Sequence, residues 1–366
     1  MAVRYVRVEP QVNLFAPAVR AFGDIAVVGR TTSQSAAIGK PVAFTNPDDA
    51  KAAFPGELAT AIALAFTQTP GPSLIHGVPV DTATPDWAHA LEAVAALNVQ
   101  LVMLANTPVN GTTNVAGGPI HLLSDHVTDV SNTGSDGMER MGVAMLEKGE
   151  TNVGVIVVNE RMVYIAHNSD QDAAAAVAGT IAGYEPPVSL LLKPVNITSP
   201  PFKPADIETI NGTETAKSGP HGQGVNWLTT PALIPGNGVY MGEGYTGDAG
   251  SGKKYIDVCR FVDDVSFQLK ARLISSIGNV RITRSGLRAL IAQMEAILTP
   301  RVDAGVLNSF EIVVPVLTLL DKDPAARSAA ETEQIHQAEV RRLVQVLAAV
   351  EYAGAVHRIS INLKFD

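Results

Sequence analysis

Hydrophobic residues occupy every second position near both ends of the chain. They are Val3, Tyr5, Val8, Ile359, Ile361, Leu363 and Phe365. Alternation with a period of two predicts β-strands, because successive side chains of a strand point to opposite faces. Pro10 and Pro17 follow the N-terminal strand, so we do not expect it to form a simple hairpin with the next segment. A terminal strand with one apolar face is either an edge of its own sheet or a strand added to the sheet of another chain.

Strands and helices alternate through the first third of the chain. The predicted strands span 23–33, 72–80 and 99–105, and the predicted helices span 45–54, 56–69 and 85–97. Short apolar runs bounded by Gly, Ser or Pro indicate the strands, and a capped 3.6-residue periodicity indicates the helices. Alternation at these lengths predicts a parallel or mixed α/β sheet.

The middle of the chain contains both regular and irregular segments. The sequence predicts helices at 118–132 and 136–148, a strand at 152–158, and an Ala-rich helix with an Asp cap at 170–184. From 185 to 250 the residues Pro, Gly and Asn are dense, which predicts hairpins and loops. We therefore expect a domain boundary near residue 250.

The last third of the chain predicts a second domain. Residues 254–277 are expected to open with a strand and to become a long helix. The other predicted elements are helices at 283–298 and 327–337 and strands at 308–320 and 340–352. Together these elements predict an α/β fold with mixed sheets, divided into two α/β domains.

Composition narrows the class of protein. Hydrophobic residues make up 46% of the 366 positions and charged residues 17%, which disfavours disorder. The single cysteine, Cys259, excludes a disulfide framework and a Cys-based zinc site. The sequence has no signal-peptide pattern and no apolar run of about 18 residues. We therefore expect a soluble protein of a reducing compartment, with no membrane insertion.

Charge is distributed unevenly along the chain. The net charge is −9, which disfavours direct nucleic-acid binding. Residues 1–252 carry a net −11 (12 basic and 23 acidic residues), whereas residues 253–366 carry a net +2 (15 basic and 13 acidic residues). This asymmetry indicates that the two parts of the chain face different neighbours.

The segment Gly247–Lys253 matches the GxxxxGK pattern of a phosphate-binding loop. Lys254 stands where such a loop has Ser or Thr, and the following residues are predicted to form a strand instead of the required helix. A tight hairpin turn explains the glycines equally well. Nucleotide binding by this segment is therefore the less favoured interpretation.

No other group of residues converges on an enzyme site. His121, Asp125 and His126 share a predicted helix but lack the further ligands that a metal site needs. Cys259 lies in an apolar pattern that is typical of a core residue, and the sequence contains no GxSxG motif. The sequence therefore predicts no catalytic residue, no cofactor and no metal.

Three arginines form a stripe on one predicted helix. Arg281, Arg284 and Arg288 are spaced so that they lie on one helical face. The stripe is either a solvated surface or a contact with an acidic partner, since Arg forms directional pairs with carboxylates.

Three segments together resemble the contractile tail sheath family of bacteriophages and related injection systems. They are 27–68, with a strand followed by a Pro-Val-x-Phe-Thr passage, the Ala-rich helix at 170–184, and the C-terminal third with Gly305 and the closing IxIxL strand. The likeness covers about two thirds of the chain, and the region 185–250 matches poorly.

The resemblance implies how the chain is divided. N- and C-terminal arms, at 1–18 and 355–366, would be exchanged between subunits as added β-strands. An outer α/β domain would span 19–250 and a tube-proximal α/β domain 251–354. The arm residues implied in this way are Val3, Tyr5, Val6, Val8, Ile359, Ile361, Leu363 and Phe365.

The resemblance also implies a mechanical function without catalysis. Subunits would polymerise helically, in stacked hexameric rings, around an inner tail tube and would contract to drive that tube through a target envelope. Arg281, Arg284 and Arg288 would contact the tube, and baseplate and tail terminator proteins would be further partners. The location would be a virion tail assembled in the host cytoplasm, or a cytoplasmic contractile injection system.

Two other functions remain open. One is a non-contractile tail component of a virion, and the other is an α/β NTPase that uses Gly247–Lys253.

Overall fold

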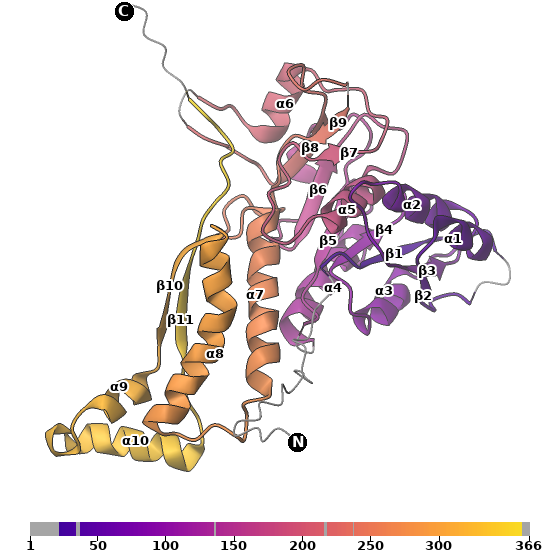
Figure 1. The fold of residues 1–366 in the computed structure, drawn as a ribbon. Coiled ribbons are helices and arrows are strands. Elements are labelled where there is room, and N and C mark those ends of the chain that lie inside the picture. Colours follow the sequence, from indigo (N-terminus) through magenta and orange to yellow (C-terminus); the bar gives the residue numbers. More distant parts are fainter. Residues whose placement is uncertain (1–21, 34–36, 135–136, 216–217, 237, 361–366) are drawn as a thin grey trace, which may run out of the picture. The chain divides into compact units, whose positions relative to one another are not determined.

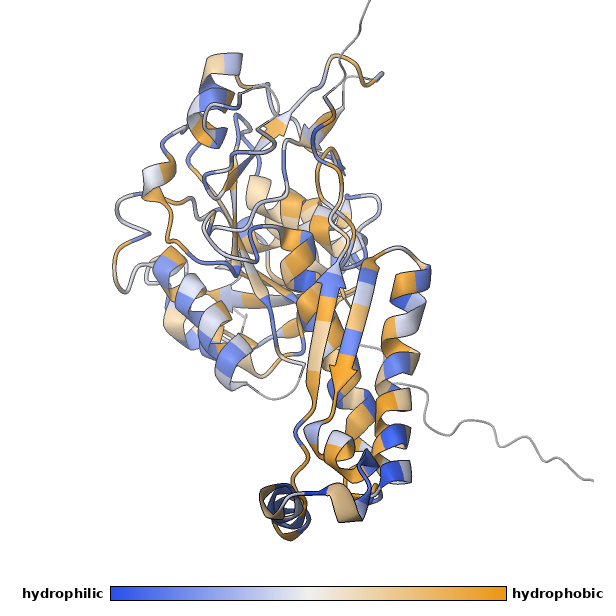
Figure 2. Cartoon of the chain, turned by 90° about the vertical axis from the view of Figure 1, so that its left-hand side faces the viewer, coloured by the Kyte–Doolittle hydropathy of each residue, from blue (hydrophilic) through white to orange (hydrophobic). Residues whose placement is uncertain are grey.

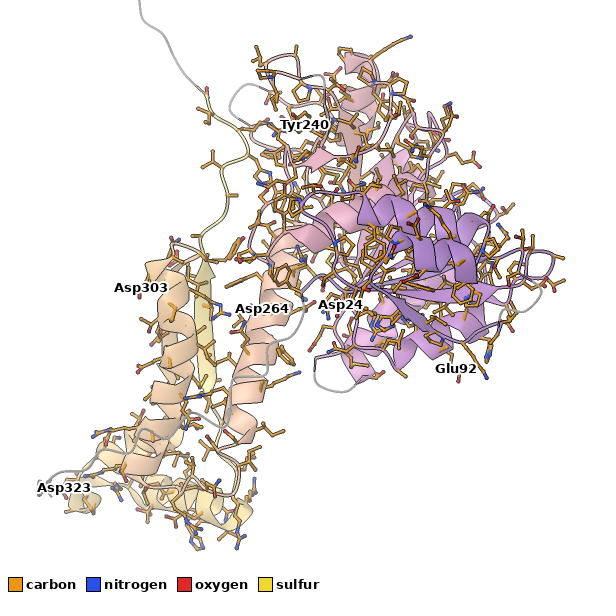
Figure 3. The ribbon with its side chains drawn as sticks, turned by 45° about the vertical axis from the view of Figure 1, so that its right-hand side comes forward. Asp24, Glu92, Tyr240, Asp264, Asp303 and Asp323 are labelled. Atoms are coloured by element: carbon orange, nitrogen blue, oxygen red, sulfur yellow. The ribbon has the colours of Figure 1, made fainter. Side chains whose placement is uncertain are left out.

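A computed structural model of the chain describes residues 22–33, 37–134, 137–215, 218–236 and 238–360. The chain divides into two compact units (Figure 1). We call residues 22–264 and 354–360 the large unit, and residues 265–353 the small unit. The division falls inside helix α7 (Ile256–Ile274), directly after Asp264, which Figure 3 labels.

The large unit is built on a nine-stranded sheet with the order β2-β3-β1-β4-β5-β6-β8-β9-β7. The six strands from β3 to β8 in this order are parallel, and β2, β9 and β7 are antiparallel additions at the edges. The strands are β1 (Ile25–Arg30), β2 (Val42–Phe44), β3 (Ile75–Val80), β4 (Leu101–Leu104), β5 (Met141–Met145), β6 (Met162–Ala166), β7 (Pro194–Val195), β8 (Val225–Thr229) and β9 (Val239–Met241).

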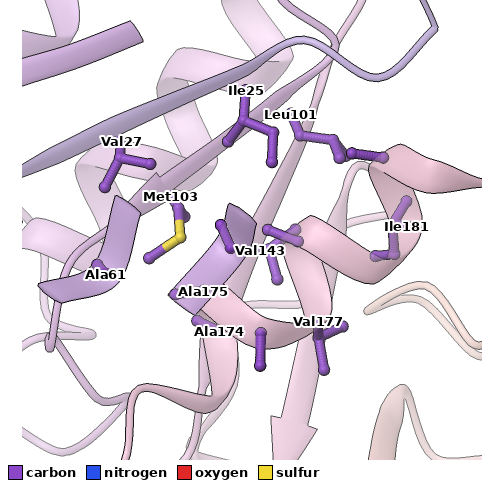
Figure 4. Close-up of a cluster of buried hydrophobic side chains, with 14 of the residues drawn as sticks. Ile25, Val27, Ala61, Leu101, Met103, Val143, Ala174, Ala175, Val177 and Ile181 are labelled. Carbon is purple, nitrogen blue, oxygen red and sulfur yellow. The ribbon is translucent and has the colours of Figure 1, made fainter. Parts of the chain in front are cut away.

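Helices cover both faces of this sheet. Helices α1 (Pro47–Ala53), α2 (Glu57–Phe66) and α5 (Ala173–Gly183) pack on one face, and α3 (Trp87–Ala95) and α4 (Pro119–Thr133) pack on the other. Helix α6 (Pro204–Asn211) joins the second cluster. In β1, Ile25 and Val27 face the α2–α5 side (Figure 4), whereas Ala26 and Val28 face α3 and α4. Burial on both faces explains why the parallel strands are continuous apolar runs.

The Ala-rich segment predicted at 170–184 forms α5, the most deeply buried helix of the large unit. Its first ten residues are all buried, and the side chain of Asp172 caps its N-terminus by accepting a hydrogen bond from the Ala175 amide. A Cβ atom on Gly179 would lie 2.4 Å from the carbonyl oxygen of Ala65 in α2. Small residues are therefore required here because the two helix backbones approach closely.

The small unit combines helices with a two-stranded antiparallel sheet. It holds the second half of α7 and then α8 (Arg284–Asp303), β10 (Leu307–Val313), α9 (Pro315–Asp321), η2 (Pro324–Ala326), α10 (Ala329–Arg341) and β11 (Leu347–Tyr352). Asp303, at the C-terminal end of α8, is labelled in Figure 3. The small unit has a small buried core of Leu287, Val314 and Leu317.

Four predicted elements are wrong in whole or in part. The strand predicted at 308–320 ends at Val313, and Pro315–Asp321 forms helix α9 instead. Residues 136–148, predicted as a helix, contain β5, and residues 152–158, predicted as a strand, contain only the short 3-10 helix η1 (Val153–Val155). The strand expected at the start of 254–277 does not form, because α7 begins at Ile256 and Tyr255 makes only an isolated bridge with Tyr245. Short apolar runs fit either a buried strand or a buried helix, so tertiary packing decides between them.

A fully buried arginine supports the α3–α4 side of the large unit. Arg140 is 1% exposed and donates hydrogen bonds to the carbonyl oxygens of Val94, Leu97 and Met138. Its Nη1 lies 3.3 Å from Nε2 of His126 on α4. Burial, together with the Arg140 charge, lowers the pKa of His126 to about 4, so this imidazole is neutral in the folded chain.

His126 therefore makes stability sensitive to acid. The folded pKa lies below that of an unfolded histidine, so the unfolded chain binds the extra proton as the pH falls from 6.5 to 4. We expect this to remove about 3 kcal/mol from the free energy of unfolding across that window. Urea unfolding at several pH values measures it. His126→Gln should flatten the pH dependence, whereas His89→Gln at an exposed position should not. Equal pH slopes for the wild type and His126→Gln would contradict this assignment.

Candidate functional site

The two-stranded sheet of the small unit has strand edges whose backbone groups can still pair with a further strand. β10 and β11 run antiparallel, with Phe310 opposite Val350 and Ile312 opposite Ala348. Helix α8 packs against β10, and Ser309 Oγ donates a hydrogen bond of 3.0 Å to Glu351 across the strands. Among the described residues, neither strand pairs with a third strand.

This strand pair is also poorly covered. Five of the six residues of β11 are exposed, including Leu347 and Val350, and Figure 2 shows hydrophobic positions along both strands. A two-stranded ribbon has marginal stability in water, and an open edge presents unpaired N–H and C=O groups to any available strand. The arrangement suits the addition of strands from another chain.

The predicted arm residues lie mostly outside the described residues. This holds for Val3, Tyr5, Val6, Val8, Ile361, Leu363 and Phe365. Ile359 is described and is 81% exposed, in a segment without regular secondary structure. Its side chain is therefore free of the core of its own chain.

The three predicted arginines do not form one helical stripe, because α8 begins at Arg284 and Arg281 lies before its N-cap, Thr283. Arg288 Nη2 lies 3.0 Å from a carboxylate oxygen of Asp321, and Arg284 Nε lies 3.7 Å from the same atom. Arg284 also donates to the carbonyl oxygen of Leu320, at the C-terminal end of α9. The side chains of Arg284 and Arg288 remain 49% and 66% exposed, so these internal contacts leave part of each accessible.

Arg281 borders a hollow of about 750 Å³ in the small unit. The apolar lining is Leu273, Ile277, Val280, Ile282, Leu287, Leu290 and Val344. Glu339 and Arg342 add charge to the same lining. Ile277 is 77% exposed, so the hollow opens onto hydrophobic surface. Sequence patterns gave no indication of this feature.

The Gly247–Lys253 segment does not form a phosphate cradle. Helix α7 does begin shortly after it, contrary to prediction, but the loop's own polar groups are already used. Lys253 Nζ lies 2.8 Å from a carboxylate oxygen of Glu160. The amides of Gly247, Gly250 and Lys253 donate within the protein. The lysine and amides that would hold a phosphate in such a loop are therefore already bonded within the protein.

The other candidate groups also remain separate. His121 contacts Asp125 on the surface of α4, while His126 faces Arg140 in the interior. Burial raises the pKa of Cys259 to about 12, which keeps its thiol protonated and unreactive. No cluster suited to a metal ion occurs among the described residues, and within them no helix has the length and apolar character of a membrane span.

The carboxyl ends of the parallel strands, where open α/β sheets commonly bind ligands, carry acidic side chains. Glu57 accepts a hydrogen bond from the Asn106 side chain, and Asp172 accepts one from the Asn106 amide. Arg30 lies 3.3 Å from Glu57. Arg30 is thus already paired, and the two carboxylates would repel a phosphate placed beside them.

A buried acidic site in the large unit was not indicated by the sequence. Glu243 is fully buried, and the residues that contact its carboxylate, His357 and Arg358, lie more than 110 positions further along the chain. Adjacent basic residues near a terminus are common, so no local pattern distinguishes this pair.

Comparison with known proteins identifies the fold. No protein-family model and no curated protein sequence matches the chain. The sheath complex of an extracellular contractile injection system, PVC, in its contracted state is similar with a TM-score of 0.69 and 11% identity, over 100% of this chain and 98% of that chain. The anti-feeding prophage baseplate gives a TM-score of 0.66 and 12% identity, over 100% and 99% of the two chains.

A bacterial protein shows a more partial likeness. The sheath tail protein Lin1278 from Listeria innocua has a TM-score of 0.56 and 11% identity, over 81% of this chain and 89% of that chain. The predicted α/β fold is confirmed, and the resemblance to the contractile tail sheath family is confirmed at the level of the fold. The chain has the fold of contractile sheath proteins.

Proposed function

We propose that this chain is a structural subunit of a contractile tail sheath, which polymerises helically around an inner tube and contracts to drive that tube through a target envelope. The observation that carries the proposal is the open two-stranded sheet of β10 and β11 in a chain whose whole length matches sheath structures. The role is structural and non-enzymatic.

Strand addition is the proposed link between subunits. The N-terminal arm (1–18) and the C-terminal arm (355–366) would each add a strand to the β10–β11 sheet of a neighbouring subunit. Main-chain hydrogen bonds would give affinity, and the alternating apolar residues of each arm would set the register. Because the arms are covalent extensions, subunits can change packing without dissociating.

The proposed contraction requires no nucleotide. Subunits would first assemble in stacked hexameric rings around the tube and then move into a packing with more favourable contacts between subunits. The free energy of these new contacts would drive the movement. This view accords with the occupied Lys253 and with the acidic ends of the parallel strands.

The proposed partners follow from the same assembly. A tail tube would lie inside the sheath, and baseplate and tail terminator proteins would close its ends. Arg281, Arg284 and Arg288 are the proposed tube contacts, since complementary charge gives register with modest affinity. The assembly would be a virion tail formed in the host cytoplasm or a cytoplasmic injection system. A non-contractile tail component is the alternative, which would assemble without a second, contracted lattice.

The N-terminal arm can be tested by electron microscopy of the purified chain. We expect hollow tubes from the intact protein, alone or with added tail tube, and none from a variant that lacks residues 1–12. The matched control is Arg4→Gln with Arg7→Gln, which keeps the hydrophobic alternation and should still assemble. Tubes from the truncated chain would remove the arm from the mechanism, and monomers from every sample even with added tube would refute the sheath function.

The tube contact is tested by reversing charge. Replacing Arg281, Arg284 and Arg288 with Glu should reduce co-assembly with the tube at least about tenfold, because three attractive contacts become repulsive. Asp321→Asn serves as the control, since it breaks the internal ion pairs of Arg284 and Arg288 but keeps all three positive charges. Unchanged co-sedimentation of the triple variant with the tube would end this assignment.

The NTPase alternative has a direct test at Lys253. We expect nucleotides to leave the melting temperature of the wild type unchanged. We also expect Lys253→Ala to lower the free energy of unfolding by at most about 1 kcal/mol, because its partly exposed pair with Glu160 is screened by solvent. Isothermal titration with ATP and Mg²⁺ provides the second measurement. Nucleotide binding by the wild type that Lys253→Ala abolishes would support the NTPase function and contradict the structural one.

A further inference from the structure

The C-terminal segment of the chain enters a buried acidic site in the large unit. Glu243 follows β9, and its side chain is fully buried. One carboxylate oxygen lies 2.9 Å from Nδ1 of His357, and the other lies 2.6 Å from Nη1 of Arg358. These two side-chain partners of the carboxylate therefore come from one dipeptide, His357–Arg358.

A second carboxylate binds the same arginine. Arg358 donates from Nε and Nη2 to the two oxygens of Glu214, both at 2.8 Å, in a parallel fork. Asn211 Nδ2 donates to Glu214 at 2.7 Å and fixes its orientation. The hydrogen bonds from Arg358 hold the pKa of Glu214 at about 2, so this carboxyl stays ionised. All three guanidinium nitrogens are thus engaged.

The imidazole of His357 is enclosed on its remaining sides. Ser189 Oγ lies 2.9 Å from Nε2, and the ring of Tyr255 packs edge-on with a centroid distance of 4.9 Å. The side chain of His357 is only 7% exposed, whereas Val356 and Ile359 are 74% and 81% exposed. A segment that is exposed on either side therefore places one buried imidazole, together with the partly exposed guanidinium of Arg358, against side chains of the large unit.

We propose that Ser189, Glu214, Glu243 and Tyr255 form a socket that anchors the C-terminal segment of the same chain through His357 and Arg358. The last backbone contact of the small unit is the Ala353 amide, which donates to the carbonyl oxygen of Val306. The next attachment along the chain is the socket. A pulling force on the chain after Ile359 therefore acts first on the socket contacts and only then on β11.

Burial of Glu243 makes the socket selective. A buried carboxylate without a cationic partner is strongly destabilising, so an empty socket is unfavourable. The fork geometry at Glu214 and the enclosed imidazole favour a His-Arg dipeptide over a single charge. The anchor exists whatever the chain assembles into. Its consequence, that a donated C-terminal arm is held at its root on its own subunit, rests on the proposed function.

Limited trypsin digestion of the full chain tests the anchor, because trypsin must bind the Arg358 guanidinium to cut before Ile359. We expect slow release of peptides that begin at Ile359, measured by mass spectrometry. Glu214→Gln should speed this release about fivefold, and Glu214→Gln with Glu243→Gln more than about tenfold. Asp170→Asn, which breaks a surface pair with Lys148 in the same unit, should leave the rate unchanged.

The possible results distinguish loss of the anchor from global unfolding and from failure to assemble. Circular dichroism of Glu214→Gln should show an unchanged fold, so that faster cleavage reports local release. Equal cleavage rates in the wild type and both Gln variants would overturn the anchor, even for a chain that forms tubes. Protection that disappears on dilution would assign the socket to a second copy and would also overturn it. Faster cleavage in a chain that never assembles would leave the anchor intact and refute only the sheath function.

Discussion

The position of helix α7 depends on one buried ion pair. Arg161, just before β6, donates from Nη1 and Nη2 to the two oxygens of Asp263 on α7 at 2.9 and 3.0 Å, and both side chains are about nine-tenths buried. Such a pair is stable only in good geometry, because both charges lose their hydration. The parallel fork therefore fixes one register of α7 on the large unit. Arg260 adds hydrogen bonds to the carbonyl oxygens of Phe22 and Tyr184.

The two units differ in how fully their strands are paired and their hydrophobic side chains are buried. The large unit encloses its parallel strands between two helical layers, and both hydrophobic clusters are fully buried. The small unit leaves β10 and β11 as a ribbon with a modest core around Leu287 and Leu317. The proposed strand addition relies on this difference, because a third strand would complete the pairing of a two-stranded ribbon that is only marginally stable alone.

The predictions succeeded where a local pattern has a single structural solution. β1, α2 and β3 combine clear periodicity with capping or glycine boundaries, and the Ala-rich pattern at 170–184 gives α5 because only small residues permit its contact with α2. They failed where one pattern has two solutions. Val153, Val155 and Ile156 of the apolar run at 152–158 pack against the second core cluster without joining the sheet. Met162–Ala166, where no strand was predicted, supplies the strand β6.

By itself the sequence determined the α/β class, most helices, the alternating ends of the chain and the exclusion of a disulfide framework, since these depend on residue type and short spacing. Only the tertiary structure decided which charges meet. Arg284 and Arg288 contact Asp321, Lys253 contacts Glu160, and the His357–Arg358 pair contacts Glu243. The physical reason is that burial makes a charge require a partner, while the identity of that partner depends on how distant segments fold together.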